Sequence, residues 1–342
     1  MTNNSIPAIV LGGTGYVSGE LIRLILGHPN FTLAGKSFPH LAGALGGVTF
    51  KSQAEIAALV GTESSTAVFC AAPHGAAAAL IDSLLKAGEA AGTKPRIVDI
   101  SADFRYSTAA AYEAVYKHPH GAPNRLSQFT CAVPEHLKSA PTPHVAHPGC
   151  FSTSILLASV PLLASGWVDP MLFVSGVTGS TGSGRKPVEG THHPTRHSDL
   201  YSYGALGHRH TPEITALAKA ATGIDAEYSF VPHSGPFARG IHATVQARLK
   251  SPRDAAAVIG MLREFYKGAP FVRVLDNAPR VKDIVASNYA HISAAANGKT
   301  VAVMSVVDNL NKGAAGGAVQ WMNRLYGLPE TAGLTAPAAG WT

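Results

Sequence analysis

The chain has 342 residues, of which 46% are hydrophobic and 14% are charged, with 35 glycines and 23 prolines. This composition excludes a disordered chain, and the length exceeds what one hydrophobic core usually supports, so we expect two domains. The formal net charge of +6 is spread along the chain, which argues against a nucleic-acid partner and favours a small phosphorylated ligand. No apolar run approaches the ~20 residues of a membrane span, and the N-terminus lacks the basic segment of a signal peptide. We therefore expect a cytoplasmic protein with no membrane partner.

The cysteines and histidines indicate neither a disulfide framework nor a metal centre. Cys70, Cys131 and Cys150 are the three cysteines, and no two of them form a C-x-x-C pair. Several of the 16 histidines gather between residues 192 and 210, but no second ligand cluster with metal spacing accompanies them. We expect no disulfide and no bound metal ion.

The N-terminal segment has the pattern of a nucleotide-binding turn. An apolar strand over 6–11 is followed by Gly-Gly-Thr-Gly-Tyr-Val-Ser-Gly and then by a helix over 20–26. Gly12 permits a tight turn, and Gly15 allows the main chain to approach a pyrophosphate held at the helix N-terminus. Ser18 stands where the usual pattern has its last glycine, which weakens the case for close packing of helix on strand.

The next strand, over 31–34, ends without the acidic residue that would bind the ribose 2′-hydroxyl of NAD. Lys36 and Ser37 follow it, and both suit a 2′-phosphate, so the pattern favours NADP. The alternative is that Lys36 is a solvated loop charge.

Two further strands extend this pattern. We expect them over 67–72, ending at Pro73, and over 96–100, ending in the segment that holds Asp103 and Arg105. A helix over 76–87 lies between them, so the alternation predicts a parallel, doubly wound sheet with ligands bound after its strands. Arg105 either pairs with Asp103 to hold a turn or contacts a substrate anion.

The sequence His-Pro-Gly-Cys-Phe-Ser-Thr-Ser places Cys150 at the start of a buried helix that continues through the apolar run 155–163. Pro148 cannot lie inside the helix, and the following Ser and Thr side chains can cap its free N–H groups. A thiol at a helix N-terminus ionises more easily than free cysteine and is nucleophilic near neutral pH. The alternative is an inert, buried cysteine, and the octapeptide alone does not separate the two.

Two histidines precede a second helix start. Thr211 is predicted to be the N-cap of this helix and Pro212 its first residue. The positive helix end disfavours the charged form of His208 and His210, which keeps either one available as a base. A cysteine with a nearby histidine is a recurrent pair in thiol catalysis, but the pattern also allows both histidines to be structural.

The second half contains two anion-binding candidates. The small residues over 179–184 are followed by Arg185, and such a loop either wraps an anion or connects elements flexibly. Arg239 precedes a strand over 241–249 and is a candidate clamp for a carboxylate or a phosphate. A late strand over 301–307 leads to a helix over 315–326, whose small residues indicate that it returns to the first domain.

Taken together, these motifs resemble the N-acetyl-gamma-glutamyl-phosphate reductase family over nearly the whole chain. The matching segments include GGTGYVSGELIRLILGHP, AAPHGAA, VDISADFR, AVPEHL, HPGCFSTS, GSTGSGRKP, GHRHTPEI, VPHSGPFARG and VVDNLNKGAAGGAVQWMNRLYGLPETAGL. The family is related to aspartate-semialdehyde dehydrogenase. Two departures are visible, because the family usually has Ser-Arg where this chain has Lys36-Ser37 and an aromatic residue where it has Cys131.

The resemblance implies an α/β fold in which a Rossmann-type doubly wound parallel sheet is joined to a second α+β domain for catalysis and dimerisation. The dinucleotide-binding domain would comprise 1–149 and 310–342, and the catalytic domain 150–309. The implied activity is the NADPH-dependent reduction of N-acetyl-L-glutamyl 5-phosphate to the 5-semialdehyde in arginine biosynthesis, by a homodimer or homotetramer. The alternatives are a related reductase for aspartyl phosphate or carrier-linked aminoadipyl phosphate, and a non-catalytic NADP-binding sensor.

The resemblance also implies roles for individual residues. Cys150 would be the nucleophile and His208 the general base or acid, with His210 the less favoured choice. The residues implied to bind the cofactor are Gly12, Thr14, Gly15, Tyr16, Val17, Lys36, Ser37, Pro73, Gly182, Asn309 and Gly313. Those implied to bind the substrate are Arg105, Arg185, His210, His233 and Arg239.

Overall fold

The computed structural model describes residues 5–34 and 51–339, and the chain divides into two compact units. The first unit comprises 1–134, 138–148 and 314–335, and the second comprises 135–137, 149–313 and 336–342. Each unit is therefore built from segments that are far apart in the sequence. Among the described residues, no helix is both long and apolar enough to span a membrane.

The first unit is built on a sheet of six strands that pair in parallel, in the order β2-β1-β3-β4-β6-β5. This confirms the predicted doubly wound sheet. Its strands are β1 (Ile6–Leu11), β2 (Phe31–Leu33), β3 (Ala67–Cys70), β4 (Arg96–Asp99), β5 (Phe129–Cys131) and β6 (His144–Ala146).

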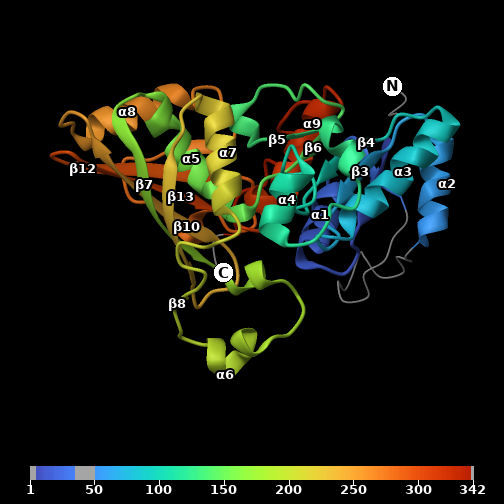
Figure 1. Cartoon of the computed structure of the whole chain (residues 1–342), viewed down its shortest axis with the longest axis horizontal. Coiled ribbons are helices and arrows are strands. Elements are labelled where there is room, and N and C mark those ends of the chain that lie inside the picture. Colours follow the sequence, from blue (N-terminus) through green and yellow to red (C-terminus); the bar gives the residue numbers. More distant parts are fainter. Residues whose placement is uncertain (1–4, 35–50, 340–342) are drawn as a thin grey trace. The chain divides into compact units, whose positions relative to one another are not determined.

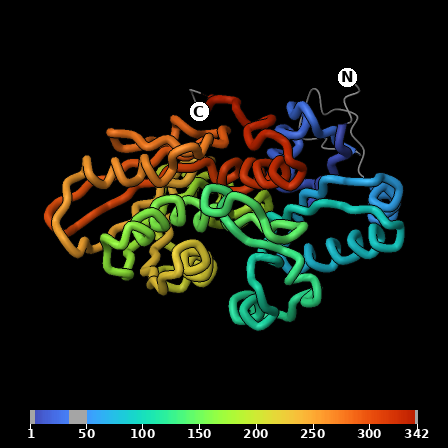
Figure 2. The backbone as a smooth tube through the Cα atoms, turned by 90° about the horizontal axis from the view of Figure 1, so that it is seen from above, coloured from blue at the N-terminus to red at the C-terminus, as the bar shows by residue number. Residues whose placement is uncertain are grey.

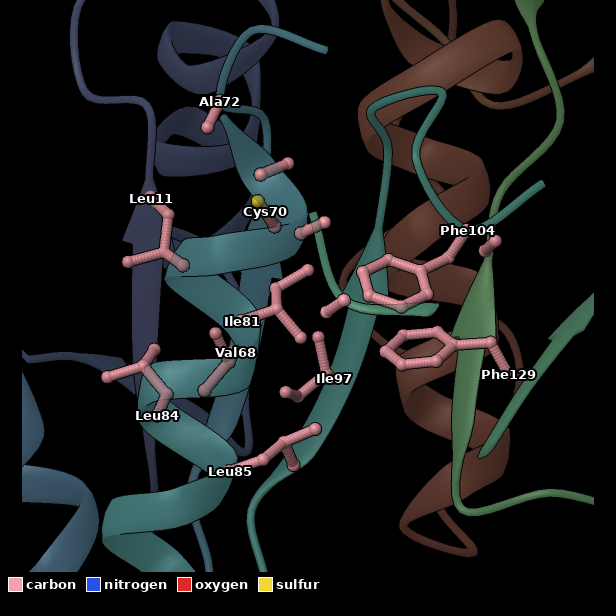
Figure 3. Packing of buried hydrophobic residues seen from close by; sticks show 14 of the residues in the cluster. Leu11, Val68, Cys70, Ala72, Ile81, Leu84, Leu85, Ile97, Phe104 and Phe129 are labelled. Carbon is pink, nitrogen blue, oxygen red and sulfur yellow. The ribbon is translucent and has the colours of Figure 1, made fainter. Parts of the chain in front are cut away.

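Both faces of this sheet are covered, because residues of both alternating sets are buried. Val68 and Cys70 lie on one face, Ala67 and Phe69 on the other, and none of the four is exposed. On the first face, helix α3 packs its apolar side chains against strands β1, β3 and β4, as Figure 3 shows for Ile81. Continuous apolar runs of this kind are typical of a buried parallel sheet.

The helices of the first unit include one from the C-terminal end of the chain. Helix α9 contacts α1 and strand β4, and Figure 2 shows this red helix beside the blue N-terminal segment. The helices are α1 (Tyr16–Leu26), α2 (Gln53–Thr62), α3 (Ala77–Ala91), α4 (Ala109–Tyr116) and α9 (Gly316–Leu325). Helix α1 begins earlier than predicted, directly after the glycine turn.

The second unit contains a mixed sheet of seven strands, in the order β11-β12-β13-β10-β7-β9-β8. The β7–β9 and β11–β12 pairs are parallel and the other pairs are antiparallel. The strands are β7 (Val168–Thr178), β8 (Tyr201–Ser202), β9 (Glu227–Ser234), β10 (Ile241–Leu249), β11 (Val272–Val274), β12 (Ala290–Asn297) and β13 (Thr300–Val307).

Helix α5 (Cys150–Ala164) lies on this sheet and is the core of the second unit. It contacts β7, β10 and β13 as well as helices α7 (Thr211–Thr222) and α8 (Ala255–Phe265), and Phe151 to Leu163 are buried without interruption. A helix that is apolar on all sides is typical of a core position. The short helix α6 (His193–Arg196) and strand β8 belong to a long excursion between β7 and α7, which Figure 1 shows in yellow-green.

Candidate active site

Cys150 is the first residue of helix α5, as the sequence predicts, and its side chain is half-buried. Gly149 is the N-cap residue, and no side-chain hydrogen bond caps this helix within the described part of the chain. The predicted capping by Ser152 or Thr153 is therefore wrong, since both hydroxyls are buried without a hydrogen-bond partner among the described residues. The positive end of the helix dipole thus favours a thiolate at Cys150.

A buried carboxylate fixes the main chain just before Cys150. Glu213, in the first turn of α7, is 1% exposed and its Oε1 accepts a hydrogen bond of 2.7 Å from the Gly149 N–H. Sequence reasoning missed this residue, because an acid in the first turn of a helix is ordinarily explained by the dipole of its own helix. The only signal was its place directly after the Thr-Pro start of α7.

His208 and His210 both lie against Phe151, the residue that follows Cys150. The ring centroids of His208 and Phe151 are 5.8 Å apart, and those of His210 and Phe151 are 6.5 Å apart. His210, not Thr211, is the N-cap of α7, so the predicted cap is one residue too late. Both predicted histidines therefore lie against the residue that follows the predicted cysteine, within the second unit.

The electrostatics of His208 keep its ring neutral at pH 7. Burial, with a smaller contribution from the charge of Arg209, lowers the pKa of His208 to about 4. The predicted direction was right, but the main cause is desolvation. The Nδ1 atom of His208 accepts a hydrogen bond of 3.2 Å from the His210 N–H, and a neutral imidazole that accepts at Nδ1 carries its proton on Nε2.

Tyr203 is a second residue that sequence reasoning missed. Its ring centroid lies 5.6 Å from that of His208. Burial raises the pKa of the Tyr203 phenol, and the charge of Cys150 raises it further. The phenol is therefore within electrostatic reach of Cys150 and stays protonated. Aromatic residues in exposed loops carry no periodic signal, which explains why the pattern did not identify it.

Gly313 packs directly against Cys150. It lies in a single turn of π-helix (Asn311–Ala315) between β13 and α9, which we call the π-turn. A Cβ atom placed on Gly313 would be 2.8 Å from the Cβ of Cys150. Real Cβ atoms do not approach so closely, so only glycine fits here. Single turns of π-helix are rare and often occur at functional sites.

Asp308 organises the loop that leads to this turn. It is fully buried and accepts hydrogen bonds from the N–H groups of Ala286, Leu310 and Asn311. Arg239 donates to both of its carboxylate oxygens, from Nε at 2.9 Å and from Nη2 at 3.1 Å. The guanidinium predicted to clamp a substrate anion thus neutralises a buried carboxylate.

Asn309 joins this loop to the small-residue loop that begins at Gly179. Its Oδ1 accepts from the Gly240 N–H at 2.7 Å, and its Nδ2 donates to the Thr181 hydroxyl at 3.0 Å. A Cβ on Gly182 would lie 4.0 Å from Asn309 Nδ2. The predicted residues Gly182, Asn309 and Gly313 therefore lie on two adjoining loops of the second unit.

The remaining substrate candidates occupy different environments. Arg185 is exposed in the loop after residues 180–183. His233 is half-buried on β9, opposite Val177 of β7. Arg105, in the first unit, donates to the main-chain oxygens of His147 and Ile100. Asp103 instead accepts from the N–H groups of Gly75 and Ala78 and from a tyrosine hydroxyl.

In the first unit, the turn between β1 and α1 has the geometry of an anion cradle. Gly12 has φ +89°, and a Cβ on it would collide with the main-chain oxygen of Ala71. Gly15 is the N-cap of α1, where a Cβ would have no neighbour closer than 3.9 Å. Ser18 is buried and donates to the Gly12 oxygen at 3.1 Å, so it stabilises the turn at the place of the missing glycine.

The other predicted cofactor residues surround this turn. Thr14 donates its N–H to the Gly12 oxygen, Tyr16 and Val17 form the first turn of α1, and no acidic residue occurs in that turn. Pro73 is exposed just after β3, close in sequence to the Ala71 main chain that Gly12 approaches. Lys36 and Ser37 lie outside the described residues.

Comparison with known families matches each half of the chain to a domain. The NAD-binding domain of semialdehyde dehydrogenase matches residues 7–135, and the semialdehyde dehydrogenase dimerisation domain matches residues 150–309. The fold is similar to that of aspartate semialdehyde dehydrogenase II from Vibrio cholerae, with a TM-score of 0.68 at 15% sequence identity, over 94% of this chain and 98% of that one.

Two relatives at higher identity carry the same name. The chain is 34% identical to N-acetyl-gamma-glutamyl-phosphate reductase from Rhodopirellula baltica, over 98% of this chain and 99% of that protein. It is 36% identical to N-acetyl-gamma-glutamyl-phosphate reductase from Symbiobacterium thermophilum, over 95% of this chain and 96% of that protein. The similarity therefore covers both units.

Proposed function

The chain belongs to the N-acetyl-gamma-glutamyl-phosphate reductase family, and on that premise we propose that it reduces N-acetyl-L-glutamyl 5-phosphate to N-acetyl-L-glutamate 5-semialdehyde with NADPH. It is an oxidoreductase with an NAD(P)-binding domain. The observation that carries the proposal is Cys150, the first residue of a buried helix whose second residue, Phe151, packs against the neutral ring of His208. This arrangement suits a nucleophile that forms an acyl-enzyme.

The first unit would bind the cofactor and the second would carry the catalytic residues. The space at Gly15, the uncapped start of α1 and the lack of an acid in its first turn fit a pyrophosphate. We assign the pyrophosphate to Gly12, Thr14, Gly15, Tyr16 and Val17, and the 2′-phosphate to Lys36 and Ser37 outside the described residues. Pro73, Gly182, Asn309 and Gly313 would lie along the nicotinamide. When bound, NADPH supplies the hydride of the reaction.

The protein's own chemistry takes place on Cys150. Its thiolate attacks the acyl carbon, the bond from that carbon to the phosphate oxygen breaks, and a thioester remains on Sγ while phosphate leaves. Main-chain N–H groups at the start of α5 would stabilise the negative oxygen of each tetrahedral intermediate. After reduction, the carbon–sulfur bond breaks and the aldehyde is released with the thiolate restored.

We propose His208 as the general base or acid of this cycle. Its Nδ1 accepts from the His210 N–H, so the neutral ring carries its proton on Nε2, and this N–H would donate a hydrogen bond to the negative oxygen of the intermediate. We propose that Arg185 and His233 contact the phosphate or carboxylate of the substrate. The contacts of Arg105 support a role in holding main chain of the first unit, and those of Arg239 a role in holding buried Asp308 of the second unit.

The test is a coupled assay with purified protein, NADPH and N-acetylglutamyl phosphate. Cys150→Ala should abolish turnover and leave NADP binding intact, and His208→Asn should lower kcat by roughly 10²- to 10⁴-fold. Aspartyl phosphate and carrier-linked aminoadipyl phosphate are compared in the same assay, and a preference for either would overturn the proposed substrate. Wild-type turnover in His208→Asn, with loss in His210→Asn, would move the role to His210.

The second unit contains the family's dimerisation domain, and we propose that it joins two or four copies of this chain. Between residues 182 and 207 the only buried residue is Arg196, so the excursion with α6 and β8 has no apolar core of its own. Leu200 and Leu206 in this excursion are 57% and 68% exposed, and Phe173 on β7 is 55% exposed. We propose that these exposed apolar side chains belong to the association surface. Light scattering should show dimers or tetramers, and Leu206→Glu with Phe173→Glu should weaken them.

A further inference from the structure

One buried ion pair in the second unit takes no part in the chemistry above. Lys312 and Glu135 are 0% and 1% exposed, and Nζ of Lys312 lies 2.6 Å from Oε1 of Glu135. The same Nζ lies 5.6 Å from the centroid of the Phe271 ring. Glu135 comes from the three-residue segment 135–137, which belongs to the second unit although its neighbours in sequence belong to the first.

Stability alone is a poor explanation for such a pair. Removing two charges from water is costly, and replacing a buried ion pair with apolar residues of similar volume is often neutral or stabilising. The best-attested use of a buried pair is to select one arrangement of the chain over others. The question is therefore which arrangement Lys312 and Glu135 select.

Lys312 lies inside the π-turn that contacts the nucleophile. The next residue, Gly313, is the one whose added Cβ would lie 2.8 Å from Cys150 Cβ and 3.1 Å from Cys150 Cα. Asp308 holds the start of this turn through the N–H of Asn311 at 2.9 Å, and the ion pair holds its centre. A shift of the Lys312 side chain would move the main chain that abuts Cys150.

Glu135 lies at the other end of a polar cluster that reaches helix α5 itself. His136, the neighbour of Glu135, is 3.1 Å from the Tyr266 hydroxyl through its Nε2, and that hydroxyl donates to the Leu157 oxygen at 2.6 Å. Pro161 has no N–H to offer Leu157, so Tyr266 satisfies the carbonyl that Pro161 leaves without its helical partner. Burial lowers the pKa of His136 to about 4, so that ring adds no charge at neutral pH.

We propose that the Lys312–Glu135 ion pair positions the Cys150 nucleophile, by locking the π-turn over residues 311–315 to the segment anchored on α5. Lys312 and Glu135 are positioning residues, since they act through Gly313 and the main chain of Cys150. The inference rests on the proposed role of Cys150 as the nucleophile.

The decisive variant is the charge-free pair Lys312→Met with Glu135→Gln, which keeps side-chain volume and leaves no buried charge. We expect a melting temperature close to that of the wild type and a kcat reduced by roughly 10- to 100-fold, as misplacement by about 1 Å can cause. The pH profile of Cys150 alkylation by iodoacetamide should shift to higher pH, because a displaced thiolate would be stabilised less by the start of the helix.

The matched control is the exposed ion pair of Lys219 and Asp225, in which Nζ lies 2.7 Å from Oδ1. Their side chains are 57% and 79% exposed. Lys219→Met with Asp225→Asn should change neither kcat nor the alkylation profile. Glu135→Gln alone is the second test variant, because its amide oxygen still accepts from Lys312.

Two results would overturn the proposal. One is a folded variant of the pair with wild-type kcat and a wild-type alkylation profile. The other is loss of folding in both test variants, because a pair that the fold requires is a stability element. Alkylation needs no substrate, so it tests positioning even if the wild-type protein fails to reduce N-acetylglutamyl phosphate, which would contradict the proposed function alone.

Discussion

Gly313→Ala tests how closely the π-turn and the nucleophile depend on each other. The new methyl group would lie 2.8 Å from the Cβ of Cys150, whereas non-bonded carbons are in contact at about 3.5–4.0 Å, so the two must separate by roughly 0.7 Å. Cys150 is held through its neighbour Gly149 by buried Glu213, so the strain is shared between the turn and the helix start. A displacement of this size at reacting groups should lower kcat by roughly 10- to 100-fold, or about 1.4–2.8 kcal/mol.

The assay measures kcat, NADP affinity and the pH profile of Cys150 alkylation on the same preparation. Gly260→Ala is the matched control, because a Cβ at that exposed position in α8 would meet no atom within 4 Å. It should leave kcat unchanged and raise the free energy of unfolding by about 0.5–1 kcal/mol. If Gly313→Ala retains kcat within a factor of about two and alkylates like the wild type, the reasoning about this contact is wrong.

Three further predictions concern stability. Burial lowers the pKa values of His136 and His144 to about 4, below the value of about 6.5 in the unfolded chain. The two neutral rings therefore contribute to the free energy of unfolding above about pH 6.5, and this contribution is lost as the pH falls toward 4. The protein should melt at a lower temperature at pH 5 than at pH 7, and equal melting temperatures would contradict the prediction. Tyr266→Phe should lower the free energy of unfolding by about 1–3 kcal/mol, and by less in a Pro161→Ala background, where alanine restores the helical N–H. Urea unfolding of the wild type, the two single variants and the double variant measures this coupling, and additive losses in the double variant would refute it. Arg239→Ala should lower the free energy of unfolding by about 3–5 kcal/mol, since a buried carboxylate loses its partner. A higher KM for the substrate at an unchanged melting temperature would instead indicate that Arg239 binds the substrate.

The parallel sheet of the first unit was largely predictable, because its central strands are continuous apolar runs bounded by turns. Strand β1 was predicted over the residues that form it, and β3 and β4 end slightly earlier than expected. Strands β5 and β6 were not predicted, because each has three residues and such a length carries no measurable periodicity. The assignment of 135–137 to the second unit also left no local signal, since it depends on contacts with distant residues such as Lys312.

The nucleophile was predictable and its supports were not. Cys150 follows a Pro-Gly pair and precedes a long apolar run, so its place at a helix start is a local property. Glu213 contacts Gly149 across 64 positions of sequence, and Arg239 contacts Asp308 across 69. A single sequence offers no way to pair residues at such separations. The pattern therefore predicted Arg239 as a candidate clamp for a carboxylate or a phosphate and gave no sign of its contact with Asp308. The individual catalytic and binding roles stay predictions.

The supports have one property in common, which is that they act on the main chain around the reacting atoms. Glu213 holds the N–H before Cys150, Asp308 holds the loop before the π-turn, and Lys312 lies within that turn. Loss of His208 should lower turnover and leave the thiol at the helix start. Loss of a support should leave every reacting group in place and change how readily the thiolate forms. The alkylation profile, read beside kcat, therefore separates chemistry from positioning at this site.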